Sequence, residues 1–228
     1  MHYRWILFDA DNTLFDFDRS EKYALEQAFS DYNIPISDEM VTIYHEVNKE
    51  CWKAFEEGEM DQNTLRSRRF ELFLKRVGVN GDSKEMGTSY LRYLANTDFM
   101  VDGARDLLDQ LLGRFKMAIV TNGLQDVQRP RVRKTKTGHY FEKIIVSEEI
   151  GASKPGEAFF EHTFEQIGQP TKTEAIIVGD NLNSDIRGGN NFGIDTCWFN
   201  PGRQRNESDV IPKYEISALR HLTSIIEE

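Results

Sequence analysis

Five short apolar stretches constrain the fold of this 228-residue chain more than any other feature. They occupy residues 4–8, 116–120, 143–147, 175–179 and 195–199. Runs such as Ile144-Ile145-Val146 are continuous rather than alternating, which is typical of strands that are covered on both faces. Helical patterns with repeating leucine or phenylalanine lie between them, at residues 104–112 and 159–167. The sequence therefore predicts a doubly wound α/β domain with a parallel sheet.

The interval between the first two predicted strands has a different character, because it contains helical patterns and no convincing strand. Apolar residues recur there at i, i+3, i+4 and i+7, which favours helices that pack on one another. Asp18 and Glu21 are spaced like a capping box, and Gly58 and Gly78 favour helix ends. The predicted division is an α/β core with an inserted all-helical domain, at residues 1–15 with 99–228 and at 16–98.

Polar side chains follow four of the predicted strands, at the sheet edge where open parallel sheets bind ligands. They are Asp9 and Asp11 after the first strand, Thr121 and Asn122 after the second, Lys154 beyond the third, and Asp180 and Asp185 after the fourth. Two carboxylates one residue apart repel each other, so the Asp9 and Asp11 pair needs a partner of opposite charge.

A divalent cation and a phosphate would account for this set of residues. Clustered carboxylates stay ionised together around Mg²⁺, which prefers oxygen ligands and completes its shell with water and substrate phosphate. Lys154 and Thr121 could then bind phosphate oxygens, together with main-chain N–H groups of the turns. A carboxylate beside that phosphate can act as a nucleophile and form an aspartyl-phosphate. A second carboxyl two residues on lies on the same side of an extended chain, where it can serve as general acid and base.

These residues, in this order, resemble the four motifs of the haloacid dehalogenase superfamily across the whole chain. The motifs are Asp9-Ala10-Asp11-Asn12-Thr13, Thr121-Asn122, Lys154-Pro155 and Gly179-Asp180 with Asp185. The resemblance implies a Rossmann-like core and an Mg²⁺-dependent phosphohydrolase. It also implies that the helical insertion is a cap that closes over the site.

The resemblance further implies a role for each motif residue. Asp9 would be the nucleophile and Asp11 the general acid/base. The phosphate-binding residues would be Thr121, Asn122 and Lys154. The Mg²⁺ ligands would be Asp9, the main-chain carbonyl of Asp11, and Asp180, with Asp185 ordering the water shell of the metal.

Longer stretches around the motifs are similar to the pyrimidine 5'-nucleotidase branch, at residues 9–16, 121–123, 179–186 and 193–198. Such enzymes remove phosphate from UMP, dUMP, dTMP and noncanonical pyrimidine nucleotides. The implied substrate is therefore a small phosphorylated molecule, a nucleotide with a pyrimidine base preferred. Residues 129–134 depart from this branch, because they are more basic and more broken by proline than expected. We interpret residues 129–136 as a solvated basic face.

Two alternatives remain open from the sequence. One is a sugar-phosphate phosphatase or phosphomutase of the same superfamily. The other is a non-catalytic protein that senses phosphate or binds a partner. Specificity would depend on the cap, where helical periodicity does not decide which aromatic and basic residues face the site and which pack. The candidates are Phe17, Tyr44, Trp52 and residues 66–69.

Composition excludes several classes of function. A formal net charge of −10 argues against sequence-independent binding of nucleic acid, because such binding needs clustered lysine and arginine. No apolar run reaches the roughly 18 residues that span a bilayer, and the first residues lack the pattern of a signal peptide. A cytoplasmic protein without a membrane partner is expected. Cys51 and Cys197 are expected to be buried thiols, and nothing in the sequence indicates the oligomeric state.

Overall fold

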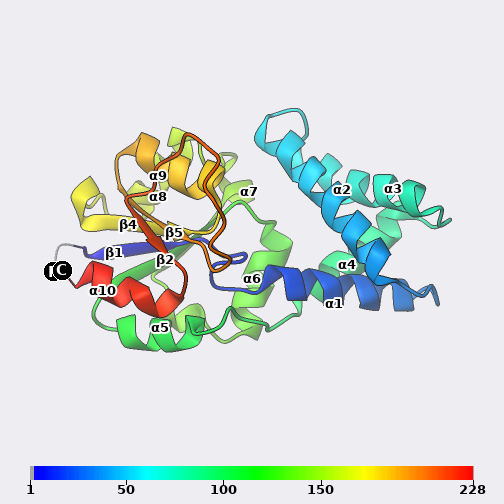
Figure 1. Cartoon of the computed structure of the whole chain (residues 1–228), viewed down its shortest axis with the longest axis horizontal. Coiled ribbons are helices and arrows are strands. Elements are labelled where there is room, and N and C mark those ends of the chain that lie inside the picture. The colour runs from blue at the N-terminus through cyan, green and yellow to red at the C-terminus, as the bar shows by residue number, and fades with distance from the viewer. Residues whose placement is uncertain (1–2, 228) are drawn as a thin grey trace.

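The computed structural model describes residues 3–227 and contains a six-stranded parallel sheet in the order β3-β2-β1-β4-β5-β6 (Figure 1). The strands are β1 (Trp5–Phe8), β2 (Lys116–Thr121), β3 (Lys143–Val146), β4 (Ala175–Gly179), β5 (Asp195–Phe199) and β6 (Tyr214–Ile216). The first five match the predicted stretches to within one residue at either end. The last strand has no predicted counterpart, because three residues with a central glutamate give no apolar run. The expected Rossmann-like α/β fold is confirmed.

Helices cover both faces of the sheet, which explains the continuous apolar strands (Figure 1). The side chains of Ile6 and Phe8 in β1 pack with one helical layer, and those of Trp5 and Leu7 pack with the other. The first layer contains α5 (Ala104–Leu111) and α10 (Leu222–Ile226), and the second contains α8 (Glu157–Gln166) and α9 (Arg187–Phe192). Both sides of β1 are therefore buried, as expected for a central parallel strand.

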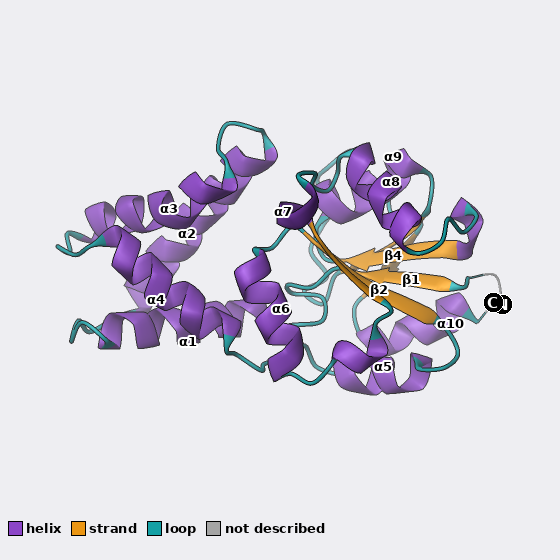
Figure 2. Ribbon diagram, turned by 180° about the vertical axis from the view of Figure 1, so that it is seen from behind, coloured by secondary structure: helices purple, strands orange, loops and turns teal. Residues whose placement is uncertain are grey.

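Four helices between β1 and α5 form a separate group beside the sheet, here called the helical group (Figures 1 and 2). They are α1 (Phe17–Ser30), α2 (Asp38–Glu56), α3 (Gln62–Val77) and α4 (Ser83–Ala95). Their apolar faces enclose a core of their own, in which the rings of Tyr44 and Phe73 meet edge to face at 5.2 Å. This packing follows from the i, i+3, i+4 spacing of the apolar residues.

Helix ends in the helical group agree with the sequence in part. Gly78 adopts a left-handed conformation (φ 66°) at the C-terminus of α3, where glycine avoids a steric penalty. The prediction that Asp18 caps α1 is wrong. Asp16 caps this helix and accepts a hydrogen bond from the Arg19 N–H at 3.0 Å, while Glu21 is buried inside the helical group.

Helix α6 (Gln125–Lys134) lies between the sheet and the helical group (Figure 2). Leu124 and Val127 at its start belong to the apolar cluster of the helical group. Pro130 lies within the helix without ending it. The prediction that this basic stretch is a solvated face is wrong for Arg131, which is completely buried. The sequence could not show this, because the partner of Arg131 is far away in the chain.

The remaining elements are short. They are α7 (Ser147–Ile150), three 3-10 turns at Gly138–Tyr140, Lys172–Glu174 and Leu219–His221, and one π-helical turn at Leu182–Ile186. None of the helices within residues 3–227 combines the length and the apolar character needed to cross a membrane. Cys51 and Cys197 are both buried and free, as predicted.

Candidate active site

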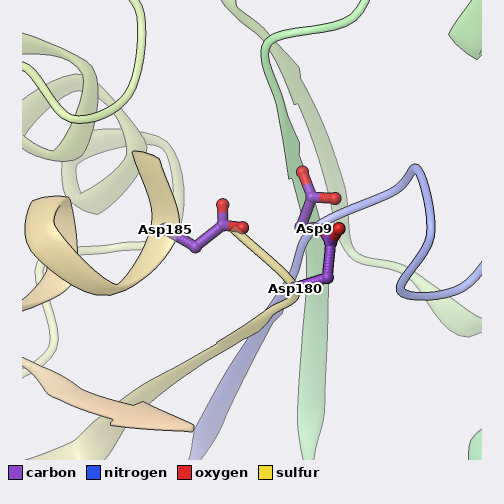
Figure 3. Close-up of side chains that lie close together, drawn as sticks. All are labelled: Asp9, Asp180 and Asp185. Atoms are coloured by element: carbon purple, nitrogen blue, oxygen red, sulfur yellow. The ribbon is translucent and has the colours of Figure 1, made fainter. Parts of the chain in front are cut away.

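The carboxyl ends of β1 and β4 bring three acidic side chains together (Figure 3). Asp9 directly follows β1, Asp180 directly follows β4, and Asp185 lies in the π-helical turn beyond it. Each side chain offers a carboxylate oxygen within 4.8 Å of those from the other two. Such a set of oxygen donors fits a hard divalent cation such as Mg²⁺. Two predicted metal ligands, Asp9 and Asp180, are thus adjacent, and Asp185 joins them.

A close approach of main chain and side chain fixes the position of Asp185. A Cβ atom added to Gly179 would lie 2.3 Å from the Asp185 Oδ2 and 2.6 Å from its Cβ. No side chain fits at that distance, so the last residue of β4 must be glycine if Asp185 is to reach the cluster. The Asp185 Oδ2 also accepts the Asn181 N–H at 3.1 Å.

Lys154 places a buried cation against this cluster. Its Nζ donates hydrogen bonds to Asp9 Oδ1 at 2.5 Å, to Asp185 Oδ1 at 2.7 Å and to the main-chain oxygen of Val120 at 2.7 Å. These bonds use all three hydrogens of the ammonium group. A phosphate oxygen that approached Lys154 would therefore replace one of the present acceptors.

Burial controls the protonation of these groups. Removal from water raises the pKa of Asp9 to about 7, although the Lys154 ammonium opposes the change. Burial, together with the charges of Asp9 and Asp185, raises the pKa of Asp180 well above its ordinary value. Burial alone would lower the pKa of Lys154, but the carboxylates of Asp185 and Asp9 outweigh it and raise that pKa. Three carboxylates thus share one ammonium, and a divalent cation would balance the remaining negative charge.

The raised pKa of Asp9 predicts how the stability of the metal-free protein depends on pH. Between about pH 4 and pH 7, folded Asp9 holds a proton that the unfolded chain, with an aspartate pKa near 3.8, has released. The folded state then binds more protons, so the free energy of unfolding falls as pH rises through this window. In EDTA, we expect the free energy of unfolding to be larger at pH 5 than at pH 7.5 by on the order of 3 kcal/mol. The melting temperature should accordingly be higher at pH 5.

Thermal melting across this pH range, with EDTA and with Mg²⁺, measures the effect. Added Mg²⁺ should stabilise the protein more at pH 7.5 than at pH 5, because its ligands must be ionised. An Asp9→Asn variant should give a flatter profile in EDTA. A wild-type profile as flat as that of the variant would contradict the raised pKa of Asp9.

The loop after β2 contributes a hydroxyl and an amide. The Thr121 Oγ1 accepts the Gly123 N–H at 3.0 Å, which leaves its own hydrogen available for a phosphate oxygen. The Asn122 side chain is engaged with the main chain of Lys154, donating to its oxygen at 2.8 Å and accepting its N–H at 2.9 Å. Asn122 therefore holds the loop that carries Lys154 against the end of β2.

Asp11 is held by two residues of α6 that the sequence did not reveal as part of the site. Arg131 donates from Nη1 to Asp11 Oδ1, and Gln128 donates from Nε2 to Asp11 Oδ2 at 2.6 Å. Arg131 and Gln128 are both buried, whereas the Asp11 side chain is 28% exposed and lines the cavity beside Asp9. Both oxygens of Asp11 are thus held in place on the side facing α6.

A cavity of about 210 Å³ lies over these residues, between the sheet and the helical group. The helical group contributes Phe17 from α1 and Asn48 and Trp52 from α2 to its wall. Tyr44, by contrast, is buried among other rings of the helical group. The structure therefore separates the predicted cap aromatics into two that face the site and one that packs.

The basic residues of α3 do not line this cavity. Arg69 is buried within the helical group. Arg66 instead pairs with Glu148 of α7 at 2.8 Å and with Asp126 of α6 at 3.2 Å. It therefore joins the helical group to the α/β part of the chain.

The fold and the acidic cluster define a class of hydrolase. A profile of the haloacid dehalogenase-like hydrolases matches residues 3–193. The chain belongs to this family.

Among known relatives, the HAD-hydrolase YfnB of Bacillus subtilis is 39% identical over 98% of this chain and 95% of its own length. The pyrimidine 5'-nucleotidase YjjG of Escherichia coli is 33% identical over 99% of both chains. The pyrimidine 5'-nucleotidase PynA of Streptococcus pneumoniae is 33% identical over 100% of this chain and 97% of its own. A crystal structure of YfnB bound to magnesium superposes with a TM-score of 0.94 at 38% identity and covers 100% of both chains.

Proposed function

We propose that this hydrolase releases phosphate from pyrimidine nucleoside 5'-monophosphates, with Mg²⁺ as cofactor and an aspartyl-phosphate on Asp9 as intermediate. The observation that carries the proposal is the meeting of Asp9, Thr121, Lys154 and Asp180 around one cavity. Two relatives named pyrimidine 5'-nucleotidases align along nearly the whole chain and support the substrate class.

The donor set of the acidic cluster fits the proposed metal. The carboxylates of Asp9 and Asp180, with the main-chain carbonyl of Asp11, would hold Mg²⁺, and Asp185 beside them would order the water shell of the metal. When bound, Mg²⁺ would supply positive charge that lets an anionic phosphate approach an anionic nucleophile.

In the first proposed step, an oxygen of Asp9 bonds to phosphorus while the bond from phosphorus to the 5'-oxygen of the nucleoside breaks. Asp11 gives its proton to the departing oxygen, which leaves as an alcohol. The Thr121 hydroxyl donates to a nonbridging oxygen of the phosphoryl group, and the Lys154 ammonium stabilises its negative charge.

In the second step, water attacks the phosphorus of the aspartyl-phosphate and Asp11, now ionised, takes the proton from that water. The bond to Asp9 breaks, and inorganic phosphate leaves with the Asp9 carboxylate restored. Because Asp11 must serve in both steps, its position has to be kept, and we assign that task to Arg131 and Gln128.

The position of the helical group supports the proposal that it acts as a cap over the active site. It covers the cavity with Phe17, Asn48 and Trp52, and it is joined to the α/β part of the chain through Arg66 and the start of α6. The same cavity of about 210 Å³ is lined by Asp9, Lys154 and Asp180, so residues of the helical group and of the acidic cluster face one space.

Phosphate release from a substrate panel tests the proposed function. We expect Mg²⁺-dependent turnover of UMP, dUMP and dTMP with kcat/KM at least about tenfold above those of purine nucleotides and sugar phosphates. A tenfold preference for sugar phosphates would favour the sugar-phosphate phosphatase, and transfer to a second position of the sugar would favour the mutase. Mg²⁺ binding without turnover of any ester would favour a non-catalytic protein.

A further inference from the structure

Asn48 is a polar residue of the cavity wall that the proposed chemistry does not use. It lies in α2, one helical turn before Trp52, and only 5% of it is exposed. It lines the same cavity as Asp9 and Lys154. A buried amide at this place is a candidate for recognising the part of the substrate that does not react.

Two charged partners fix the orientation of the Asn48 amide. Its Nδ2 donates to Glu21 Oε1 at 2.8 Å, and its Oδ1 accepts from Arg69 Nη1 at 3.1 Å. A carboxylate can only accept when ionised, and a guanidinium can only donate. A flipped amide would therefore set donor against donor and acceptor against acceptor, so the two partners hold Asn48 in one orientation.

Burying the hydrogen-bonded network of Asn48, Glu21 and Arg69 costs free energy. This cost indicates that the network has a function beyond stability. Glu21 is completely buried and Arg69 is 2% exposed, within a cluster of aromatic rings. The Tyr90 hydroxyl also donates to Glu21 at 3.4 Å, and His45 Nδ1 lies beside the other oxygen of Glu21. Charged groups in such surroundings carry a desolvation penalty that an apolar cluster of the same volume would avoid.

The amide keeps hydrogen-bonding capacity for a ligand. A primary amide has two N–H donors and two lone pairs on its oxygen, and the network uses one of each. One donor and one acceptor of the Asn48 amide therefore remain for a ligand. Phe17 and Trp52 line the cavity with Asn48 and offer flat apolar surfaces on which a ring can stack.

We propose that Asn48 is a specificity-determining residue that pairs with the imide edge of a uracil or thymine ring. That edge presents a ring N–H next to a carbonyl oxygen, which complements the remaining acceptor and donor of Asn48. Glu21 and Arg69 act as positioning residues, because they hold the amide in its orientation. This inference rests on the proposed nucleotide substrate, and it identifies the residue that recognises the base of that substrate.

The proposal is tested by comparing a substrate that has the imide edge of a pyrimidine base with one that lacks the base. For the Asn48→Ala variant, we expect kcat/KM for UMP to fall at least about tenfold, the effect of losing one or two hydrogen bonds. Ribose 5-phosphate has the same reacting group and no base, so its kcat/KM should change less than about twofold. Asn63, an exposed residue of α3, provides the matched control. The Asn63→Ala variant should have the wild-type kcat/KM for both substrates.

The wild-type protein gives a second measurement that does not depend on how the variant folds. UMP methylated at N3 lacks the ring N–H, and its kcat/KM should be at least about tenfold below that of UMP. In Asn48→Ala, the two nucleotides should become nearly equal. The role of Asn48 would be overturned if the variant lost kcat/KM equally for UMP and for ribose 5-phosphate. It would also be overturned if the variant still preferred UMP over N3-methylated UMP as strongly as the wild type does. Neither result would contradict the proposed nucleotidase function. Failure of the wild type to hydrolyse UMP would overturn the proposed function as well.

Discussion

Phosphate release by an Asp9→Asn variant is expected to fall by at least about 10⁴-fold. The amide of asparagine is a poor nucleophile and cannot form the aspartyl-phosphate. Stability should respond in the opposite direction, because the change removes one of three clustered carboxylates, of which only Asp9 and Asp185 pair with the Lys154 ammonium. In EDTA at pH 7.5, we expect the variant to melt at or above the wild-type temperature. Steady-state phosphate release and thermal melting provide the two readouts.

An aspartate away from the site supplies the control for this change. Asp106 is exposed in the first turn of α5, so Asp106→Asn should retain wild-type turnover. Trapping with labelled substrate should leave label on the wild-type protein and none on Asp9→Asn. Turnover of the Asp9 variant within about a hundredfold of wild type would exclude Asp9 as the nucleophile.

An Asp11→Ala variant is expected to lose both activity and stability. Turnover of a nucleotide should fall by about 10²–10⁴-fold, the range for removing a general acid/base. The free energy of unfolding should fall by about 3 kcal/mol, because the completely buried Arg131 guanidinium would lose its counter-charge. Arg131 reaches Asp11 through Nη1, and its Nε and Nη2 have no hydrogen-bond partner among the described residues. Chemical denaturation and steady-state kinetics measure the two losses.

A second substitution separates these two effects. Replacing Arg131 by methionine in the Asp11→Ala background removes the unpaired charge, so part of the lost stability should return. Activity should stay low, since the acid/base group is still absent. If Asp11→Ala were as stable as wild type, the buried pair with Arg131 would not contribute to folding in the way its burial indicates.

The core of the fold could be predicted because its signals are local. A strand buried on both faces needs consecutive apolar residues, and β1, β2 and β4 show them directly. The residue that follows each strand must then lie at the carboxyl edge of the sheet. For this reason Asp9 and Asp180 could be assigned to one site before any coordinates were known.

Helix ends were less certain, because more than one residue can cap the same helix. Asp16 and Asp18 both precede the apolar stripe of α1, and both can accept a main-chain hydrogen bond. The chain leaves the first motif through a turn in which Asn12 adopts a positive φ of 58° and accepts the Phe17 N–H. That turn starts the helix at Phe17 and selects Asp16 as the cap.

Local sequence patterns were enough to identify the residues that could perform the chemistry and the edge of the sheet where they would meet. The polar residues that hold and supplement them became visible only in the folded chain. Arg131 stands 120 positions from Asp11 within a basic run that indicates a solvated helix face, and Asn48 stands 27 positions from Glu21 on an amphipathic helix. Whether such a group is buried depends on partners distant in the chain, because only a hydrogen bond or an opposite charge offsets the cost of removing it from water.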